Sequence, residues 1–282
     1  MAMKSHKIKL IAFDFDGVIC NSAPEMGRSC LDVAFEFQQA KQEFTVAEHE
    51  KFRSFFNSIR PYLEVGYQGV LVALWFTQQN LRTTLPLPSE NASAKEWEEF
   101  LKILAIHVAE LFPEKTRNTS HYPAILTEKL GERRDELLNS DPSQWNKLNP
   151  LYAGMPELLL ELLANDQNVV AIVSTKQERF IHAILEHARL PIKRALIFGL
   201  EGGLKEIVLK NLLTSYSPSQ AYFIEDRVET LRRVTLDQQL CAWKLLFATW
   251  GYATPEQHLL VKKTPRITAV TSLSFATLLK HS

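Results

Sequence analysis

The sequence has few cysteines, no net charge and no long apolar stretch. Its 282 residues include three cysteines, and Lys plus Arg equal Asp plus Glu at 32 each. An odd cysteine count without Cys-x-x-Cys spacing favours a reducing cytosol over a disulfide framework. The balanced charge provides no basic surface for nucleic acid, and no segment approaches the roughly 18 consecutive apolar residues of a membrane helix. We expect a cytoplasmic globular protein that binds neither nucleic acid nor membrane, and its oligomeric state stays open.

Two acidic residues follow the first apolar run of the chain. The run from Ile8 to Phe13 is typical of a buried parallel strand and leads into Asp14-Phe15-Asp16-Gly17. A single Asp-Gly pair is most often a turn cap. Two carboxylates this close, however, repel each other by roughly 4 kcal/mol at an effective dielectric near 20. The pair therefore predicts a bound cation, and Mg²⁺ is the natural candidate because it prefers oxygen ligands.

A long helical stretch follows this first strand. Apolar residues recur with helical spacing, and prolines at positions 61, 86, 88, 113 and 142 mark the breaks. We find no convincing strand between Pro24 and about Asn139. The pattern predicts a helical insert containing the helices Pro24–Gln39, Val46–Ile59, Val65–Leu81, Ala94–Leu111 and Ala124–Leu138.

Strands and helices alternate in the last part of the chain. Such alternation with short links indicates βαβ units and a doubly wound parallel sheet, which the first strand must join to bury both of its faces. The predicted class is therefore α/β, with a Rossmann-like core (1–21 and 150–282) and an all-α cap (22–149). The expected strands are Asn168–Ser174, Ala195–Phe198, Ala221–Ile224 and Trp243–Thr249, and the expected helices are Met155–Leu163, Gln177–His187, Leu204–Leu213 and Val228–Val234.

Polar residues follow the strand ends, which share one edge of such a sheet. Ser174 and Thr175 follow the second strand, Lys205 opens the helix after the third, and Glu225-Asp226 follows the fourth. Each signal is weak by itself. In this order, they indicate a single site together with the two acids of the first strand.

These residues resemble the four motifs of the haloacid dehalogenase superfamily of hydrolases. Asp14-Phe15-Asp16-Gly17-Val18 is similar to the first motif, Ser174 to the second, Lys205 to the third and Glu225-Asp226 to the fourth. The helical insert resembles a cap of the type that these enzymes place after the first motif. The chain also resembles an uncharacterised plant and cyanobacterial branch, through stretches such as Arg60-Pro61 with Gly66-Tyr67, Ser174–Gln177, Phe223–Arg227 and Trp250-Gly251-Tyr252.

The resemblance implies Mg²⁺-dependent hydrolysis of a small phosphorylated metabolite. Asp14 would attack phosphorus to form an aspartyl phosphate, and Asp16 would act as general acid and base. An acid at position 16 separates phosphate chemistry from dehalogenation. The implied metal ligands are Asp14, the Asp16 carbonyl oxygen, Asp226 and Glu225, and the implied substrate contacts are Gly17, Ser174, Thr175 and Lys205, with Arg60 from the cap.

Several points stay open at this stage. The second acid of the metal site is either Glu225 or Glu229. Arg60 either reaches the substrate or forms an ion pair inside the cap. For Lys176 we favour a solvated position at the start of a helix over contact with substrate. A phosphomutase with the same motifs, or a silent binding or regulatory member of the fold, remains an alternative, and the substrate is not predicted.

The remaining motifs have weaker interpretations. Trp250-Gly251-Tyr252 either lines the rim of the site or packs its aromatic rings against the cap. The charged run Glu132–Glu136 is most simply an exposed, salt-bridged helix face.

Overall fold

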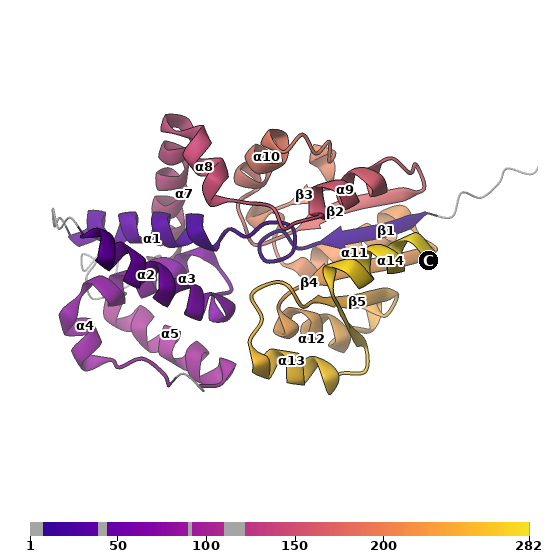
Figure 1. Ribbon diagram of the computed structural model, residues 1–282. Coiled ribbons are helices and arrows are strands. Elements are labelled where there is room, and N and C mark those ends of the chain that lie inside the picture. The colour runs from indigo at the N-terminus through magenta and orange to yellow at the C-terminus, as the bar shows by residue number, and fades with distance from the viewer. Residues whose placement is uncertain (1–7, 39–43, 90–91, 110–121, 282) are drawn as a thin grey trace, which may run out of the picture. The chain divides into compact units, whose positions relative to one another are not determined.

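The computed structural model describes residues 8–38, 44–89, 92–109 and 122–281. The chain divides into two compact units, one formed by residues 1–21 with 150–282 and the other by residues 22–149. Figure 1 shows the elements of both. Among the described residues, no helix combines the length and the apolar character needed to cross a membrane.

The first unit is built on a six-stranded parallel sheet in the order β3-β2-β1-β4-β5-β6. This order confirms the expected doubly wound class. Strand β1, the first in the sequence, lies between β2 and β4, and four of its five residues are fully buried. The strands are β1 (Lys9–Phe13), β2 (Asn168–Val173), β3 (Ile197–Phe198), β4 (Gln220–Glu225), β5 (Trp243–Ala248) and β6 (Ile267–Val270).

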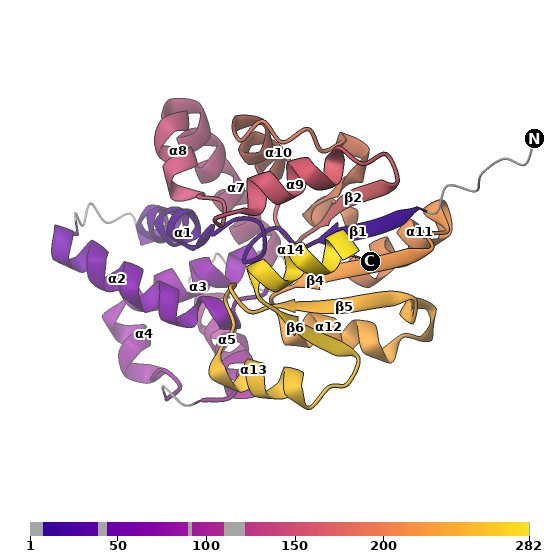
Figure 2. The same cartoon turned by 45° about the vertical axis from the view of Figure 1, so that its right-hand side comes forward.

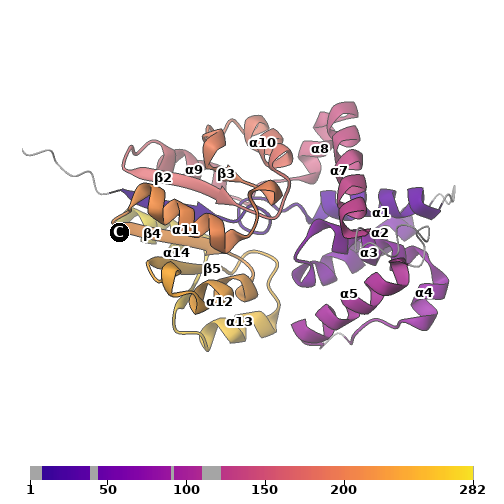
Figure 3. The same ribbon diagram turned by 180° about the vertical axis from the view of Figure 1, so that it is seen from behind.

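Helices cover both faces of this sheet. Figure 1 and Figure 3, seen from opposite sides, show α9 (Met155–Leu163) and α14 (Ser272–His281) over one face and α11 (Lys205–Tyr216) and α12 (Val228–Leu236) over the other. The α11 and α12 face packs apolar side chains against Leu10 and Ala12 of β1. The unit also contains α10 (Glu178–His187) and α13 (Pro255–Lys262).

The edge strands differ most from the sequence expectation. A four-residue strand was expected over 195–198, but residues 194–196 form a 3-10 turn and β3 keeps two residues. Strand β6 was not predicted because it has only four residues, the middle two of which are exposed. Figure 2 shows it beside β5. An edge strand has a neighbouring strand on one side only. Its run of apolar residues in the sequence is therefore short.

The second unit is helical, as expected. Its elements are α1 (Ala23–Gln38), α2 (Val46–Ile59), the 3-10 turn η1 (Arg60–Tyr62), α3 (Gly66–Thr77), α4 (Gln79–Thr84), α5 (Ala94–Ala109), α7 (Tyr122–Ser140) and α8 (Pro142–Leu148). Helix α3 is central, and residues 69–76 are all buried. The predicted ends Gln39 and Leu111 lie outside the described residues.

The helix expected over Val65–Leu81 is wrong as a single element. It stops at Thr77, and Gln78 adopts an extended conformation before α4 begins. The Thr77 hydroxyl donates a hydrogen bond back to the Ala73 carbonyl at 2.9 Å, a contact that competes with regular helix geometry. Arg82 then satisfies the Phe76 carbonyl at the helix end, at 2.6 Å.

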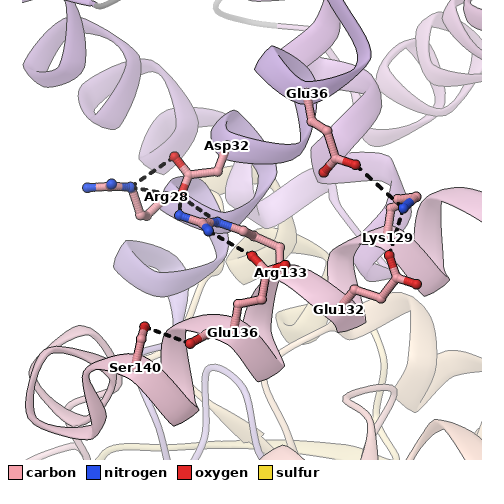
Figure 4. A network of polar contacts seen from close by, with 8 residues as sticks. All are labelled: Arg28, Asp32, Glu36, Lys129, Glu132, Arg133, Glu136 and Ser140. Atoms are coloured by element: carbon pink, nitrogen blue, oxygen red, sulfur yellow. Dashed lines mark hydrogen bonds and ion pairs between the residues drawn. The ribbon is translucent and has the colours of Figure 1, made fainter. Parts of the chain in front are cut away.

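Helices α1 and α7 are joined by charged pairs of two kinds. On the outside, Asp32 accepts from Arg133 at 2.9 Å, and Glu36 lies 3.5 Å from Lys129 (Figure 4). On the inside, Arg134 donates to Glu25 at 2.7 Å, and the two side chains are 6% and 0% exposed. The prediction of an exposed run at 132–136 is therefore wrong for Arg134, whose position on α7 faces the interior of the unit.

Candidate functional site

Asp14 lies at the carboxyl end of β1. Its backbone N–H continues the sheet by donating to the Ile224 carbonyl at 2.8 Å. Its side chain is buried, and Oδ1 accepts a hydrogen bond from the N–H of Phe15 at 2.8 Å. The register of β1 therefore points this carboxylate at the edge of the sheet where ligands bind in open α/β folds.

A tight loop follows and brings Asp16 back toward the same edge. Gly17 has a φ of +88°, a conformation that other residues rarely adopt. Its N–H donates to the Cys20 carbonyl, while the N–H groups of Ile19 and Cys20 share the Phe15 carbonyl. The loop thereby satisfies its backbone within a few residues and keeps both acids at the strand tip.

Lys205 connects the ends of β1 and β4. Its ammonium lies 3.0 Å from Asp14 Oδ1 and 2.8 Å from Glu225 Oε2, and all three side chains are at most 8% exposed. Burial alone would lower the pKa of Lys205, but the charges of Asp14 and Glu225 raise it above its usual value. The ammonium is therefore a permanent positive charge between two strand ends.

The carboxylates of Asp14, Glu225 and Asp226 form a buried cluster. One oxygen of each lies within 4.8 Å of the others. Burial, followed by the nearby charge of Glu225, raises the pKa of Asp14 to about 7 in spite of the opposing charge of Lys205. Such a site has an excess of negative charge that a cation would relieve.

The donor set and its surroundings fit a divalent cation. Three carboxylates supply hard oxygen ligands, and a Cβ on Gly17 would overlap Asp226 Oδ2, so the backbone approaches that carboxylate as closely as a glycine allows. Glu225 belongs to this cluster. Glu229 instead accepts from the side-chain amide of Gln257 at 3.2 Å. Of the two acids that the sequence left open, Glu225 lies in this cluster, and its oxygens also accept from Lys205 and from the N–H of Arg227.

Ser174 and Thr175 follow β2, the strand next to β1. Phe13 is in register with Ile172, which places Ser174 close to the level of the first-motif acids. Ser174 is buried, its N–H donates to the Phe198 carbonyl at 2.9 Å, and its hydroxyl accepts from the N–H of Lys176 at 3.3 Å. Thr175 is partly exposed.

Lys176 is not solvated, and that prediction is wrong. Its ammonium is fully buried and lies 3.4 Å from Asp16 Oδ1. The loop after β3 packs on the backbone of Lys176. The Lys176 carbonyl accepts from the N–H of Leu200 at 2.9 Å, and a Cβ on Gly199 would lie 2.6 Å from that oxygen. The glycine at position 199 permits this close approach, but its place in the sequence does not identify Lys176 as the partner.

Arg60 lies in the helical unit. It is 9% exposed, and its guanidinium donates to the Leu63 carbonyl at 2.9 Å, closing the turn between α2 and α3. A contact between Arg60 and substrate stays a prediction.

Solved structures with the same architecture include hydrolases. A predicted phosphoglycolate phosphatase from Haemophilus somnus superposes with a TM-score of 0.54, at 17% identity, over 99% of each chain. A haloacid dehalogenase-like family hydrolase from Streptococcus pneumoniae gives a TM-score of 0.50, at 14% identity, over 96% of this chain and 98% of that one. The chain has the haloacid dehalogenase-like fold.

At this identity the likeness establishes the fold alone. A predicted phosphatase from Clostridium acetobutylicum, with a TM-score of 0.53 and 15% identity over 98% of this chain and 100% of that one, agrees with it. No family model and no curated protein sequence matches the chain. The haloacid dehalogenase-like core accounts for the convergence of the acids and Lys205 at one sheet edge, since each follows a strand of the same parallel sheet.

Proposed function

We propose that the chain is a divalent-metal-dependent phosphatase that hydrolyses a small phosphomonoester through an aspartyl phosphate on Asp14. The observation that carries the proposal is the position of Lys205, 3.0 Å from Asp14 and 2.8 Å from Glu225, beside a cluster of three buried carboxylates. A buried nucleophile, a fixed cation and a set of oxygen ligands are what phosphoryl transfer requires.

The contacts of Asp14 support its role as nucleophile. The N–H of Phe15 and the ammonium of Lys205 both bind Oδ1. These contacts fix the carboxylate and leave Oδ2 to attack phosphorus. The loss of the ester oxygen then requires a proton, which Asp16, the next acid of the loop, would donate before accepting one from the hydrolytic water.

The charge of the site supports a dication. Four carboxylates (Asp14, Asp16, Glu225 and Asp226) face two buried ammonium groups (Lys176 and Lys205), so the formal charge is negative by two. A bound Mg²⁺ would neutralise this charge and polarise the phosphoryl group when bound. Asp14, Glu225 and Asp226 would hold it, together with the Asp16 carbonyl oxygen. Ser174 would donate to a phosphoryl oxygen.

The test is a panel of phosphomonoesters, scored by released phosphate with Mg²⁺ or with EDTA. p-Nitrophenyl phosphate serves as the generic substrate. 2-Phosphoglycolate comes first among metabolites because of the name given to the Haemophilus somnus protein. We expect turnover that EDTA abolishes and Mg²⁺ restores. No turnover with any ester would overturn the proposal and favour a binding protein of the same fold. The likeness to a plant and cyanobacterial branch remains a prediction.

A further inference from the structure

The segment Trp250-Gly251-Tyr252 lies beside the acidic cluster. It follows β5, whose Phe247 is in register with Glu225 at the end of β4. Because the two strands are parallel and adjacent, the residues that leave β5 come next to those that leave β4. The segment therefore meets Asp226 directly, which neither of the two sequence-based interpretations of this motif included.

Two features of this segment contact the Asp226 carboxylate. The backbone N–H of Tyr252 donates to Oδ2 at 2.7 Å. A Cβ on Gly251 would lie 2.6 Å from the same oxygen and would overlap Asp226 Cβ and the Gly17 carbonyl oxygen. The carboxylate is thus held between two glycine backbones, one from the loop after β1 and one from the loop after β5.

The aromatic side chains of the segment attach it to the loop after β1. Trp250 Nε1 donates to the Val18 carbonyl at 3.0 Å, and the Tyr252 hydroxyl contacts Asn21 Oδ1 at 2.9 Å. Asn21 is itself fixed, since its N–H donates to the Pro150 carbonyl at 2.8 Å. Tyr252 therefore joins Asp226 of the cluster to the loop that follows Asp14 and contains Asp16.

We propose that Tyr252, with Gly251, is a positioning residue for the divalent metal, acting by fixing the Asp226 carboxylate. The inference rests on the proposed function, because it concerns the same site. Aromatic packing alone would account for Trp250, whose ring lies 6.1 Å from that of Phe275. It does not account for a backbone N–H directed at a buried carboxylate, or for glycine on both sides of that carboxylate.

The physical role is pre-organisation. A hydrogen bond to Oδ2 fixes the orientation of Asp226, so that its remaining lone pairs point into the cluster before the cation arrives. Without the hydrogen bond from the Tyr252 hydroxyl to Asn21, the backbone N–H of Tyr252 is still present, but its position is less firmly fixed. Affinity for the metal should fall while the fold persists.

The experiment measures Mg²⁺ affinity by isothermal titration calorimetry, with Mg²⁺ alone as the probe, together with the melting temperature of each protein. Tyr252→Phe removes only the hydroxyl. Tyr216→Phe, at the carboxyl end of α11, is the matched control. We expect Tyr252→Phe to weaken Mg²⁺ binding about tenfold, the low end of the range for changes around a metal ligand, because the variant loses the bond to Asn21 and keeps the N–H that binds Asp226. We expect Tyr216→Phe to leave Mg²⁺ binding unchanged.

Gly251→Ala is a second, stronger variant, because its Cβ must displace Asp226 or Gly17. We expect a loss of about a hundredfold in Mg²⁺ affinity. A purely structural segment would lower the melting temperatures of the Tyr252→Phe and Gly251→Ala variants and leave the Mg²⁺ affinity of Tyr252→Phe at the wild-type value, which would overturn this inference alone. A wild-type protein that binds no Mg²⁺ would overturn the proposed function as well.

Discussion

At the scale of the residue, Asp14 illustrates a conflict between stability and chemistry. Its carboxylate is buried with Glu225 and Asp226, and the ammonium of Lys205 and the N–H of Phe15 offset the repulsion at its Oδ1. A nucleophile has to lie in this position, whereas a stable interior would not contain so many acids. The cost of the arrangement should become visible when the charge is removed.

Asp14→Asn is therefore expected to have opposite effects on activity and stability. Phosphatase activity should fall by roughly 10⁴-fold, because an amide cannot replace the nucleophile. The melting temperature in EDTA should rise, because one buried negative charge is gone while Oδ1 can still accept its hydrogen bonds. Differential scanning fluorimetry and phosphate release measure the two effects.

Asp166→Asn is the control for this change, since Asp166 lies exposed before β2. It should alter neither activity nor melting temperature. Unchanged turnover in Asp14→Asn would contradict the nucleophile assignment, and a lowered melting temperature in EDTA would contradict the argument from buried charge.

Lys176 is a second residue with a testable role. Its buried ammonium lies 3.4 Å from Asp16, so it orients the proposed acid and base. Lys176→Met should lower kcat by about 10- to 100-fold, less than the roughly 100- to 10,000-fold that a general acid and base contributes, because Asp16 itself remains. Lys193→Met, at an exposed lysine before the 3-10 turn at 194–196, is the matched control. Equal kcat values for the two variants would show that the contact with Asp16 is dispensable.

At the scale of the element, the pair of α1 and α7 combines a buried and an exposed ion pair. Arg134→Met leaves Glu25 as an uncompensated buried charge, and we expect a loss of about 3–5 kcal/mol in the free energy of unfolding. Lys129→Met, which breaks the exposed pairs with Glu36 and Glu132, should cost much less. Urea denaturation followed by far-UV circular dichroism compares them.

The double variant Glu25→Met with Arg134→Met sharpens this comparison. Removing both charges should restore much of the stability that Arg134→Met loses, because no unpaired charge remains. A double variant as unstable as the single one would mean that the shape of the pair matters and its charge does not.

The helices and strands also show how much of the fold could be predicted from the sequence. Central strands and long helices were predictable: α2 and α9 have the predicted bounds, and β1, β2, β4 and β5 agree to within a residue or so at each end. These segments have full apolar periodicity. The edge strands β3 and β6 lack this apolar periodicity because each has a neighbouring strand on one side only.

The candidate site was predictable in part for a different reason. Glu225 and Asp226 follow a strand, and that placement alone brings them to the common sheet edge. Lys176 and Tyr252, in contrast, lie in loops. The backbone of Lys176 packs against Gly199, and the backbone N–H of Tyr252 donates a hydrogen bond to Asp226. A local sequence pattern does not show which distant residue a loop residue contacts. These two contacts could therefore be identified only from the structure.

At the scale of the whole molecule, burial separates the three cysteines. Cys20 and Cys30 are buried, and Cys241 is exposed. Burial raises the pKa of the Cys30 thiol, so little of the reactive thiolate forms. Iodoacetamide should modify Cys241 alone in the native protein and all three cysteines in urea, as read by mass spectrometry. Rapid modification of Cys30 without denaturant would contradict the packing of the helical unit.

The position of β1 in the sheet has a consequence for synthesis of the protein. Lys9 pairs with Asn168 on one side and with Gln220 on the other, so both partners are made long after β1 leaves the ribosome. At about 5–20 residues per second, the second partner arrives roughly 10–40 s later. During that interval the helical unit can fold, while β1 has neither partner until β2 is made and only one until β4 is made. Because unpaired strand edges and exposed apolar surface favour aggregation, we expect this segment to be the part of the nascent chain most in need of protection.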